Sequence, residues 1–212
     1  MGTFISLDGP DGGGKTTQIC LLHEELERRG FPVTRTREPG GTALGERIRN
    51  ILLDPVSQAD PVTEALMYAA ARAQLVSRVI RPALEEGQVV LVERFYHSSI
   101  AYQSYGSGVA LNMTRALAEI ATGGLTPDLT LILDISPEIV FRERIVSRPL
   151  DRIEGRGLQF HRRVREGFLA LAADEPGRLR VIDATSSVRE VHARVLRAVE
   201  SLLGKELGGE VR

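Results

Sequence analysis

Cysteine is nearly absent from this chain of 212 residues, where Cys20 is the only one. A single cysteine excludes a disulfide framework, and its place in a predicted helix favours a small core residue. An excess of charge of one sign is also missing, because 27 Lys and Arg side chains balance 28 Asp and Glu side chains. The resulting net charge of −1 excludes a global basic field for nucleic acid, so any anion must be bound at a local site.

Long apolar runs are absent as well. The first apolar run extends only from Phe4 to Leu7, whereas a membrane helix needs about 20 apolar residues. The same run is too short for the core of a signal peptide. We therefore expect a cytoplasmic protein that does not span a membrane. The length fits a single domain, residues 1–212, that is large enough to bury its own core.

The sequence does contain a phosphate loop. Gly9 to Thr16 matches the pattern G-x-x-x-x-G-K-[ST], with a strand-like run before it and a helix-like run after it. Backbone N–H groups of such a loop surround a phosphate, Lys15 reaches the β- and γ-phosphates, and the Thr16 hydroxyl can bind Mg²⁺. The predicted ATP-binding residues are Gly9, Pro10, Asp11, Gly12, Gly13, Gly14, Lys15, Thr16 and Thr17.

Strand-like and helix-like runs alternate along the chain, which predicts an α/β fold with a parallel sheet. The predicted strands are Thr3–Asp8, Pro32–Thr36, Gln88–Glu93, Leu129–Asp134 and Leu179–Asp183. The predicted helices are Gln18–Arg29, Leu44–Leu53, Pro61–Leu84, Met113–Ala121, Pro137–Ser147, Leu158–Ala173 and Val188–Leu203. In parallel sheets, ligands bind beyond the carboxyl ends of the strands.

A second group of candidate residues lies at such a strand end. Glu93 can face Mg²⁺ or its bound water, while Arg94 can point at a phosphate. A surface ion pair after a strand is the ordinary alternative. Residues 148–157 form an arginine- and glycine-rich loop between two predicted helices.

Three further motifs, read together with the phosphate loop, give the chain a family resemblance. They are Thr36-Arg37-Glu38-Pro39-Gly40-Gly41-Thr42, Ser98-Ser99-Ile100-Ala101-Tyr102-Gln103 and Leu150-Asp151-Arg152-Ile153-Glu154. In this order they resemble the thymidylate kinases, P-loop nucleoside monophosphate kinases, over nearly the whole chain. The resemblance implies that fold, with a five-stranded parallel sheet and a small lid, residues 148–157. It also implies transfer of the γ-phosphoryl group of ATP to dTMP with Mg²⁺, giving dTDP and ADP.

The resemblance also implies roles for single residues. Lys15, Glu93, Arg94 and a lid arginine would be catalytic, with Thr16 and Glu93 at the metal. Tyr68 would lie under the thymine, Arg72 would reach a thymine carbonyl, and Tyr102 would disfavour a ribose 2′-hydroxyl. The implied substrate-binding residues are Asp11, Glu38, Arg49, Tyr68, Arg72, Arg94, Ser99, Tyr102 and Gln103.

This chain departs from the family pattern in three places. Asp8 and Glu93 stand where the family usually has glutamate and aspartate, so the two acids are exchanged. Ser107 replaces an arginine that many bacterial members carry. His97 replaces an aspartate, and we expect it to be a surface loop residue without a catalytic role.

The phosphate loop of this chain contains no arginine, so the resemblance assigns the catalytic arginine to the lid. Arg148, Arg152 and Arg156 are the candidates, with Arg152 first. The family further implies a homodimer formed by helix packing. The alternatives are a kinase for another nucleotide or deoxynucleoside and, from a different class, a GTP-binding switch. The second lacks support because the chain contains no Asn-Lys-x-Asp motif.

Overall fold

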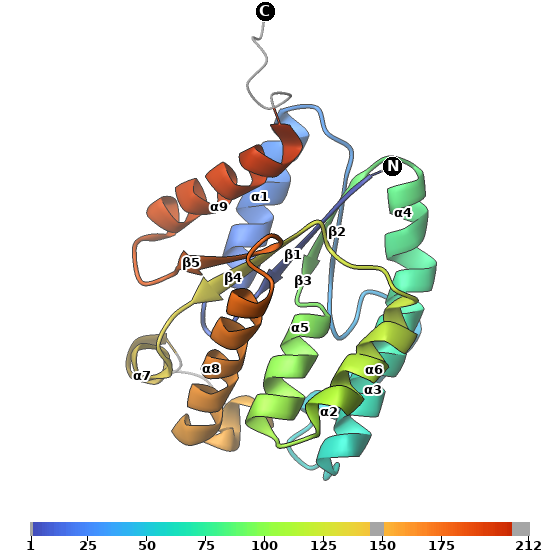
Figure 1. Cartoon of the computed structure of the whole chain (residues 1–212), viewed down its shortest axis with the longest axis vertical. Helices are drawn as coiled ribbons and strands as arrows, with labels where there is room; N and C mark the ends of the chain where they lie inside the picture. The colour runs from blue at the N-terminus through green and yellow to red at the C-terminus, as the bar shows by residue number, and fades with distance from the viewer. Residues whose placement is uncertain (1, 145–150, 205–212) are drawn as a thin grey trace, which may run out of the picture.

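A five-stranded parallel sheet forms the centre of the molecule (Figure 1). The computed structural model describes residues 2–144 and 151–204. The strand order is β2-β3-β1-β4-β5, and all four neighbouring pairs are parallel. The strands are β1 (Thr3–Asp8), β2 (Val33–Arg37), β3 (Val89–Glu93), β4 (Leu129–Asp134) and β5 (Leu179–Asp183). The predicted α/β fold is confirmed, and every predicted strand is found to within one residue at each end.

Helices cover both faces of this sheet (Figure 1). One face carries α1 (Lys15–Arg28) and α9 (Val188–Leu203), which pack against each other. The other side carries α3 (Pro61–Leu75), η1 (Val76–Ile80), α4 (Arg81–Glu85), α5 (Tyr96–Ser99), η2 (Ile100–Gly106), α6 (Leu111–Thr122) and α8 (Leu158–Asp174). The remaining elements are α2 (Ala43–Leu53), which packs on α3, and the short α7 (Pro137–Ile139), η3 (Val140–Arg144) and η4 (Glu154–Arg156). No described helix is long and apolar enough to cross a membrane.

The alternation of side chains along the strands divides the core into two layers. Phe4 points to the layer that contains α5, η2 and α8, while Ile5 and Leu7 point to the layer beneath α1 and α9. Val90 and Leu91 divide between the layers in the same way. Burial on both faces explains why these strands are almost continuously apolar. Their carboxyl ends all lie at one edge of the sheet, where the polar motifs gather.

Several helix predictions need correction. The predicted helix Pro61–Leu84 consists of α3, the π-helical η1 and α4. The helical segment from Tyr96 to Gly106, formed by α5 and the π-helical η2, was not predicted at all. Of the predicted helix Pro137–Ser147, residues 145–147 lie outside the described residues.

Two residues are buried differently from what the sequence suggested. The prediction of His97 as a surface loop residue is wrong. It is fully buried in α5, where its ring packs 4.1 Å from that of Tyr96 and Nδ1 lies 3.4 Å from Thr130 Oγ1. Cys20 is half-buried beside Arg35 and is therefore not a core residue.

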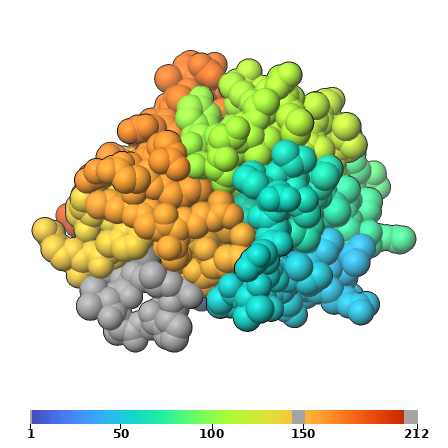
Figure 2. Space-filling model, turned by 90° about the horizontal axis from the view of Figure 1, so that it is seen from below, coloured from blue at the N-terminus to red at the C-terminus, as the bar shows by residue number. Residues whose placement is uncertain are grey.

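The described part of the predicted lid lies against α2 and α3. Seen from below, the orange atoms that follow residue 150 abut the teal atoms of α3 (Figure 2). Arg152 Nε donates to the Leu52 carbonyl oxygen at the end of α2 (2.8 Å). Residues 148–150, with the candidate Arg148, lie outside the described residues.

Glycines allow η2 and α8 to approach each other closely. A Cβ on Gly167 in α8 would lie 2.7 Å from Tyr105 Cγ, and one on Gly106 would lie 2.6 Å from the Phe160 ring. Side-chain atoms at these distances overlap, so the two helices keep this spacing only because both positions lack a side chain. The contact connects the helix that follows the lid to the helix that carries Tyr102 and Gln103.

Gly167→Ala should therefore destabilise the protein by about 1–3 kcal/mol, because overpacking outweighs the gain in helix propensity. Urea denaturation measures the change. The matched control is Gly177→Ala, since a Cβ at Gly177 meets nothing within 4 Å, and its effect should stay within about 0.5 kcal/mol. Equal stability of the two variants would contradict the close approach.

Candidate active site

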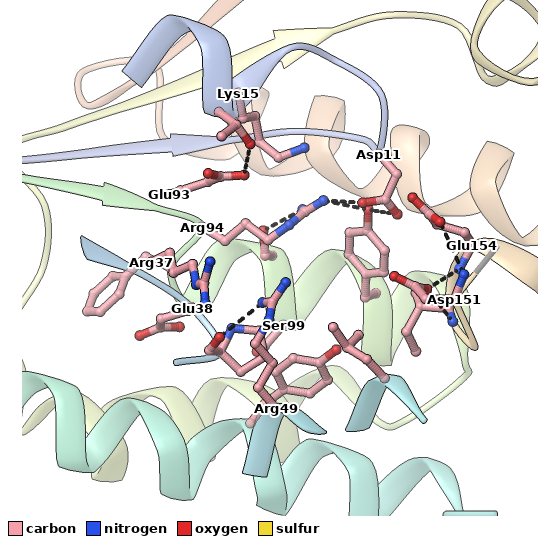
Figure 3. A pocket seen from close by; sticks show the side chains of 18 of the residues that line it. Asp11, Lys15, Arg37, Glu38, Arg49, Glu93, Arg94, Ser99, Asp151 and Glu154 are labelled. Carbon is pink, nitrogen blue, oxygen red and sulfur yellow. Dashed lines mark hydrogen bonds and ion pairs between the residues drawn. The ribbon is translucent and has the colours of Figure 1, made fainter. Parts of the chain in front are cut away.

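The phosphate loop joins β1 to α1 and forms the upper wall of a pocket of about 520 Å³ (Figure 3). Gly14 takes a left-handed conformation (φ +82°) immediately before α1. The helix therefore begins at Lys15, where its N-terminal N–H groups face the pocket and favour an anion. Lys15 Nζ donates to the carbonyl oxygens of Gly9 (3.1 Å) and Pro10 (2.7 Å). Burial, with Arg94 nearby, lowers the pKa of Lys15 to about 8.

Thr16 and Glu93 meet at the mouth of the phosphate loop. Thr16 Oγ1, on the first turn of α1, donates to Glu93 Oε1 at the end of β3 over 2.9 Å. Both side chains line the pocket. Hard oxygen ligands suit Mg²⁺, which usually keeps several waters and takes one or two protein ligands beside substrate phosphates. No group of three or more His, Cys, Asp or Glu in the described chain could hold a metal alone. The pair fits Mg²⁺ bound together with a nucleotide.

Arg94 occupies the middle of the pocket (Figure 3). It has a left-handed φ of +67°, the only one among the described non-glycine residues. Its guanidinium donates to the Gly9 carbonyl oxygen (2.9 Å), forms an ion pair with Asp11 and lies 5.1 Å from the Tyr102 ring centre. Burial alone would raise the pKa of Asp11, but Arg94 and Lys15 hold it below its ordinary value. The Tyr102 hydroxyl donates to the other Asp11 oxygen (2.7 Å).

Asp8 supports this arrangement from the core. It is fully buried and accepts from Ser98 Oγ (2.5 Å) and from the Phe95 amide (3.2 Å), the residue after Arg94. Asp8 does not line the pocket, whereas Glu93 does. Of the two exchanged acids, the longer one, Glu93, therefore lines the pocket, and the shorter one, Asp8, lies in the core.

A second polar cluster lies at the far end of the pocket. Arg72 Nε donates to Glu38 Oε2 (2.8 Å), and Arg72 Nη2 donates to Ser99 Oγ (2.9 Å). Both charged side chains are buried. Burial raises the pKa of Glu38 to about 7, against the opposing effect of Arg72. Tyr68 lies one helical turn before Arg72 on α3 and also lines the pocket.

Two more arginines face the pocket from its open side. Arg49 Nη1 donates to the Pro39 carbonyl oxygen (3.0 Å), and Arg37 pairs with Glu46. Burial and the charge of Arg37 lower the pKa of Arg49. With Arg72 and Arg94, four guanidinium groups line one pocket that begins at a phosphate loop. Such a surface can hold a second phosphate group opposite the first.

The structure brings most of the predicted site residues together. The predicted residues that line the pocket are Asp11, Gly12, Gly14, Lys15, Thr16, Thr17, Glu38, Arg49, Tyr68, Arg72, Glu93, Arg94, Ser99, Tyr102 and Gln103. The predicted residues Gly9, Pro10 and Gly13 belong to the phosphate loop but do not line the pocket. Arg152 does not line the pocket, because its guanidinium is bonded to Glu64 and to the Leu52 carbonyl oxygen.

Other lining residues were not predicted as site residues. They are Arg37, Pro39, Leu53, Phe95, Ser98, Asp151, Ile153 and Glu154. Several of them stand within the motifs that carried the family resemblance, so their neighbours were the available signal. Arg156 Nη1 donates to the Ser107 hydroxyl (2.7 Å), so an arginine from elsewhere in the chain lies at the position where the resemblance led us to expect one.

This fold and this pocket define a P-loop kinase with room for a phosphorylated acceptor. The family model for thymidylate kinase matches residues 7–195, and the chain belongs to the thymidylate kinase family. It is an ATP-dependent kinase that phosphorylates dTMP to dTDP.

Individual relatives agree with the family match over at least 93% of this chain. Thymidylate kinase from Pelotomaculum thermopropionicum is 53% identical over 213 residues, covering 100% of this chain and 99% of the relative. Thymidylate kinase from Deinococcus radiodurans is 49% identical over 199 residues, covering 94% and 97%. The crystal structure of thymidylate kinase from Ehrlichia chaffeensis matches with a TM-score of 0.78 and 32% identity, covering 93% of this chain and 98% of that one.

The affinity for ATP should fall as the pH rises above about 8. A polyphosphate favours the ammonium form of Lys15, so loss of that proton weakens binding by up to about tenfold per pH unit. Calorimetric titration with ATP from about pH 7 to about pH 9.5 measures this dependence.

The chain contains only two lysines, Lys15 and Lys205, which supplies matched controls. Lys205→Arg should keep the wild-type pH profile. Lys15→Arg should bind ATP more weakly but with a flat profile, because a guanidinium keeps its charge in this range. The same slope in both variants would show that Lys15 is not the titrating group.

Proposed function

We propose that the two substrates meet at Arg94, with ATP on the phosphate loop and dTMP between α3 and η2. The observation that supports this placement is the continuity of the pocket, which runs from Lys15 past Arg94 to Tyr68 and Gln103. Lys15 and the loop N–H groups hold the β- and γ-phosphates of ATP. Arg49 and Arg94 hold the phosphate of dTMP, which accepts the γ-phosphoryl group.

The thymidine part of dTMP then lies at the far end of the pocket. Tyr68 offers its ring to the base, while Arg72, Ser99 and Gln103 offer hydrogen-bonding groups to the base edges. Asp11 and Glu38 lie beside the deoxyribose and the phosphate. Tyr102 stands near the sugar, where its ring leaves little room for a 2′-hydroxyl. A site that hydrogen-bonds one base edge rejects a mismatched edge strongly, because its buried polar groups then remain unpaired.

Thr16 and Glu93 would hold Mg²⁺, directly or through water. Bound there, the ion neutralises charge on the β- and γ-phosphates. The remaining catalysis is positioning and positive charge, because phosphoryl transfer requires little covalent chemistry from the protein. The phosphate of dTMP is already ionised, so the protein needs no strong general base. Arg94 faces both phosphates and offsets charge as it moves between them.

An arginine of the lid completes the positive charge around the transferred group. Arg152 is the first candidate, with Arg148 and Arg156 as alternatives. In this structure Arg152 is bonded to Glu64 (2.5 Å) and to Leu52. Catalysis by Arg152 therefore requires a second lid arrangement, in which its guanidinium leaves these partners when ATP is bound.

We also propose a homodimer that uses the outer face of α3. Val62 and Leu66 are exposed there (43% and 51%), and Ala70 and Ala73 continue the stripe. Exposed apolar stripes on a helix favour packing against another surface. Sedimentation velocity measures the oligomeric state directly, and a monomer at micromolar concentration would exclude this proposal. The cytoplasmic location expected from the sequence stays a prediction.

Glu93→Gln should lower kcat by about 100-fold or more, while the affinity for ATP measured without Mg²⁺ changes little. The reason is that the carboxylate acts on the metal and not on the nucleotide alone. Steady-state kinetics over a range of Mg²⁺ concentrations, together with calorimetric binding of ATP, separate the two effects. Glu85→Gln, at an exposed position ahead of β3, is the control. Normal turnover of Glu93→Gln at limiting Mg²⁺ would contradict the metal role.

Arg152→Ala should lower kcat by about 10³-fold and leave the affinity for ATP nearly unchanged, since the side chain acts in the transition state. The same measurement on Arg148→Ala and Arg156→Ala identifies the catalytic arginine among the three. Arg162→Ala, which removes an exposed partner of Glu138 on α8, is the control. The lid mechanism is wrong if all three lid variants turn over within a few-fold of the wild type.

A further inference from the structure

Glu64 is a buried carboxylate that the proposed mechanism does not use. It lies in the first turn of α3, is 0% exposed and does not line the pocket. Three side chains donate to it. Gln103 Nε2 donates to Oε1 over 3.0 Å, and Arg152 and Arg156 each donate to Oε2 over 2.5 Å. One carboxylate therefore joins α3, η2 and the segment that contains two lid arginines.

The contact with Glu64 fixes the direction of the Gln103 amide. A carboxylate held by two guanidiniums accepts hydrogen bonds and does not donate them. It must therefore face the NH₂ group of Gln103 and not the carbonyl group. The carbonyl oxygen, Oε1, then points the other way. This atom is buried, and no described residue donates to it. Gln103 lines the pocket, and a buried acceptor without a donor is a group that a ligand bound beside it can satisfy.

Thymine supplies the group that this acceptor lacks. In dTMP the sugar occupies N1, so N3–H is the one N–H donor of the base, and carbonyl groups flank it on both sides. Cytosine presents a lone pair at N3 instead. Two acceptors would then face each other in a buried site, and both would remain unpaired. The direction of the Gln103 amide thus distinguishes the two pyrimidines.

We propose that Glu64 is a positioning residue for base specificity: it holds the Gln103 amide so that its carbonyl oxygen accepts a hydrogen bond from thymine N3–H. The proposal rests on the placement of the base beside Gln103 given above. In the lid arrangement of this structure Arg152 and Arg156 donate to the same carboxylate, and each also donates to a second acceptor, the Leu52 carbonyl oxygen and Ser107 Oγ. The Glu64 carboxylate therefore accepts hydrogen bonds both from the lid arginines and from the Gln103 amide. When Arg152 leaves Glu64, Arg156 still holds the carboxylate as an acceptor for Gln103.

Glu64→Gln tests the proposal because it replaces an acceptor with a group that can also donate. The new amide can donate to Gln103 Oε1 and so allow Gln103 to turn its NH₂ group toward the base. The ratio of kcat/KM for dTMP to that for dCMP should fall by about 30-fold or more, mainly through loss of dTMP activity. Glu64→Asp, which still only accepts, should keep the ratio within about threefold of the wild type while lowering both values.

The control is Glu138→Gln, which neutralises an exposed partner of Arg162 and should leave both kcat/KM values unchanged. A merely structural role for Glu64 predicts that Glu64→Gln lowers activity with dTMP and dCMP equally. An unchanged ratio therefore overturns the proposal.

A substrate analogue isolates the hydrogen bond itself. In 3-deaza-dTMP a C–H group replaces N3–H, so the wild type should use it about 30-fold or more less efficiently than dTMP. In Glu64→Gln this penalty should shrink to a few-fold, which makes the two changes non-additive. The same penalty in both proteins overturns the proposal.

Two further measurements keep the test decisive if Glu64→Gln folds poorly or if the base lies elsewhere. In the wild type, NMR should show the Gln103 NH₂ protons protected from exchange without dTMP, and protection that appears only with dTMP overturns the proposal. Gln103→Ala should lose the preference for dTMP over dCMP. If it keeps that preference, the placement of the base is wrong; if only the Glu64→Gln ratio stays unchanged, the role of Glu64 alone fails.

Discussion

The left-handed backbone of Arg94 is the constraint on which the arrangement of this active site depends. A non-glycine residue in this region costs about 1–3 kcal/mol and persists only where its surroundings determine it. Here the surroundings are the Gly9 carbonyl oxygen and Asp11 on the phosphate loop, with Tyr102 on η2. Asp8 holds the following residue, Phe95, through its amide. The turn after β3 therefore aims a guanidinium back across the sheet edge, to the place where we propose that the two phosphates meet.

Two ion pairs of the pocket differ in how deeply they are buried. Arg94 and Asp11 are partly exposed to the pocket, whereas Arg72 and Glu38 are almost completely buried at its far end. A buried pair contributes little net stability once its desolvation is counted, but it fixes geometry because breaking it leaves an uncompensated charge. Such pairs hold donors in place before the substrate arrives, and preorganised donors cost no reorganisation during the reaction.

Local chemistry made part of this structure predictable. The phosphate loop and the strand β1 follow from neighbouring residues, and so does the parallel sheet, because both faces of its strands are apolar. The segment Tyr96–Gly106 was missed because several of its side chains are polar and face the pocket, and because its π-helical part breaks the 3.6-residue period.

Burial of single polar residues was the other limit of the sequence. From the sequence, Glu64 is an ordinary acidic residue in the first turn of a helix, where an exposed carboxylate would interact favourably with the helix dipole. Its three partners come from residues 39 to 92 positions away, and no local pattern indicates them. The burial of His97 could not be predicted for the same reason, because its contact with Thr130 joins residues far apart in the sequence. The family motifs contain many of the residues that line the pocket, but they do not indicate the buried residues that hold those side chains in place.

The close contact of η2 with α8 through Gly106 and Gly167 also determines how stiff this part of the molecule is. Densely packed protein has low compressibility, so a displacement at one side of such a contact is transmitted to the other. At this contact the Tyr105 ring packs directly on Gly167, and the Phe160 ring packs directly on Gly106. No free space is left between α8 and the helix that carries Gln103 to absorb a shift. If residues 151–156 move, as the proposed lid mechanism requires, the displacement would reach the far end of the pocket through the backbone, independent of any charge.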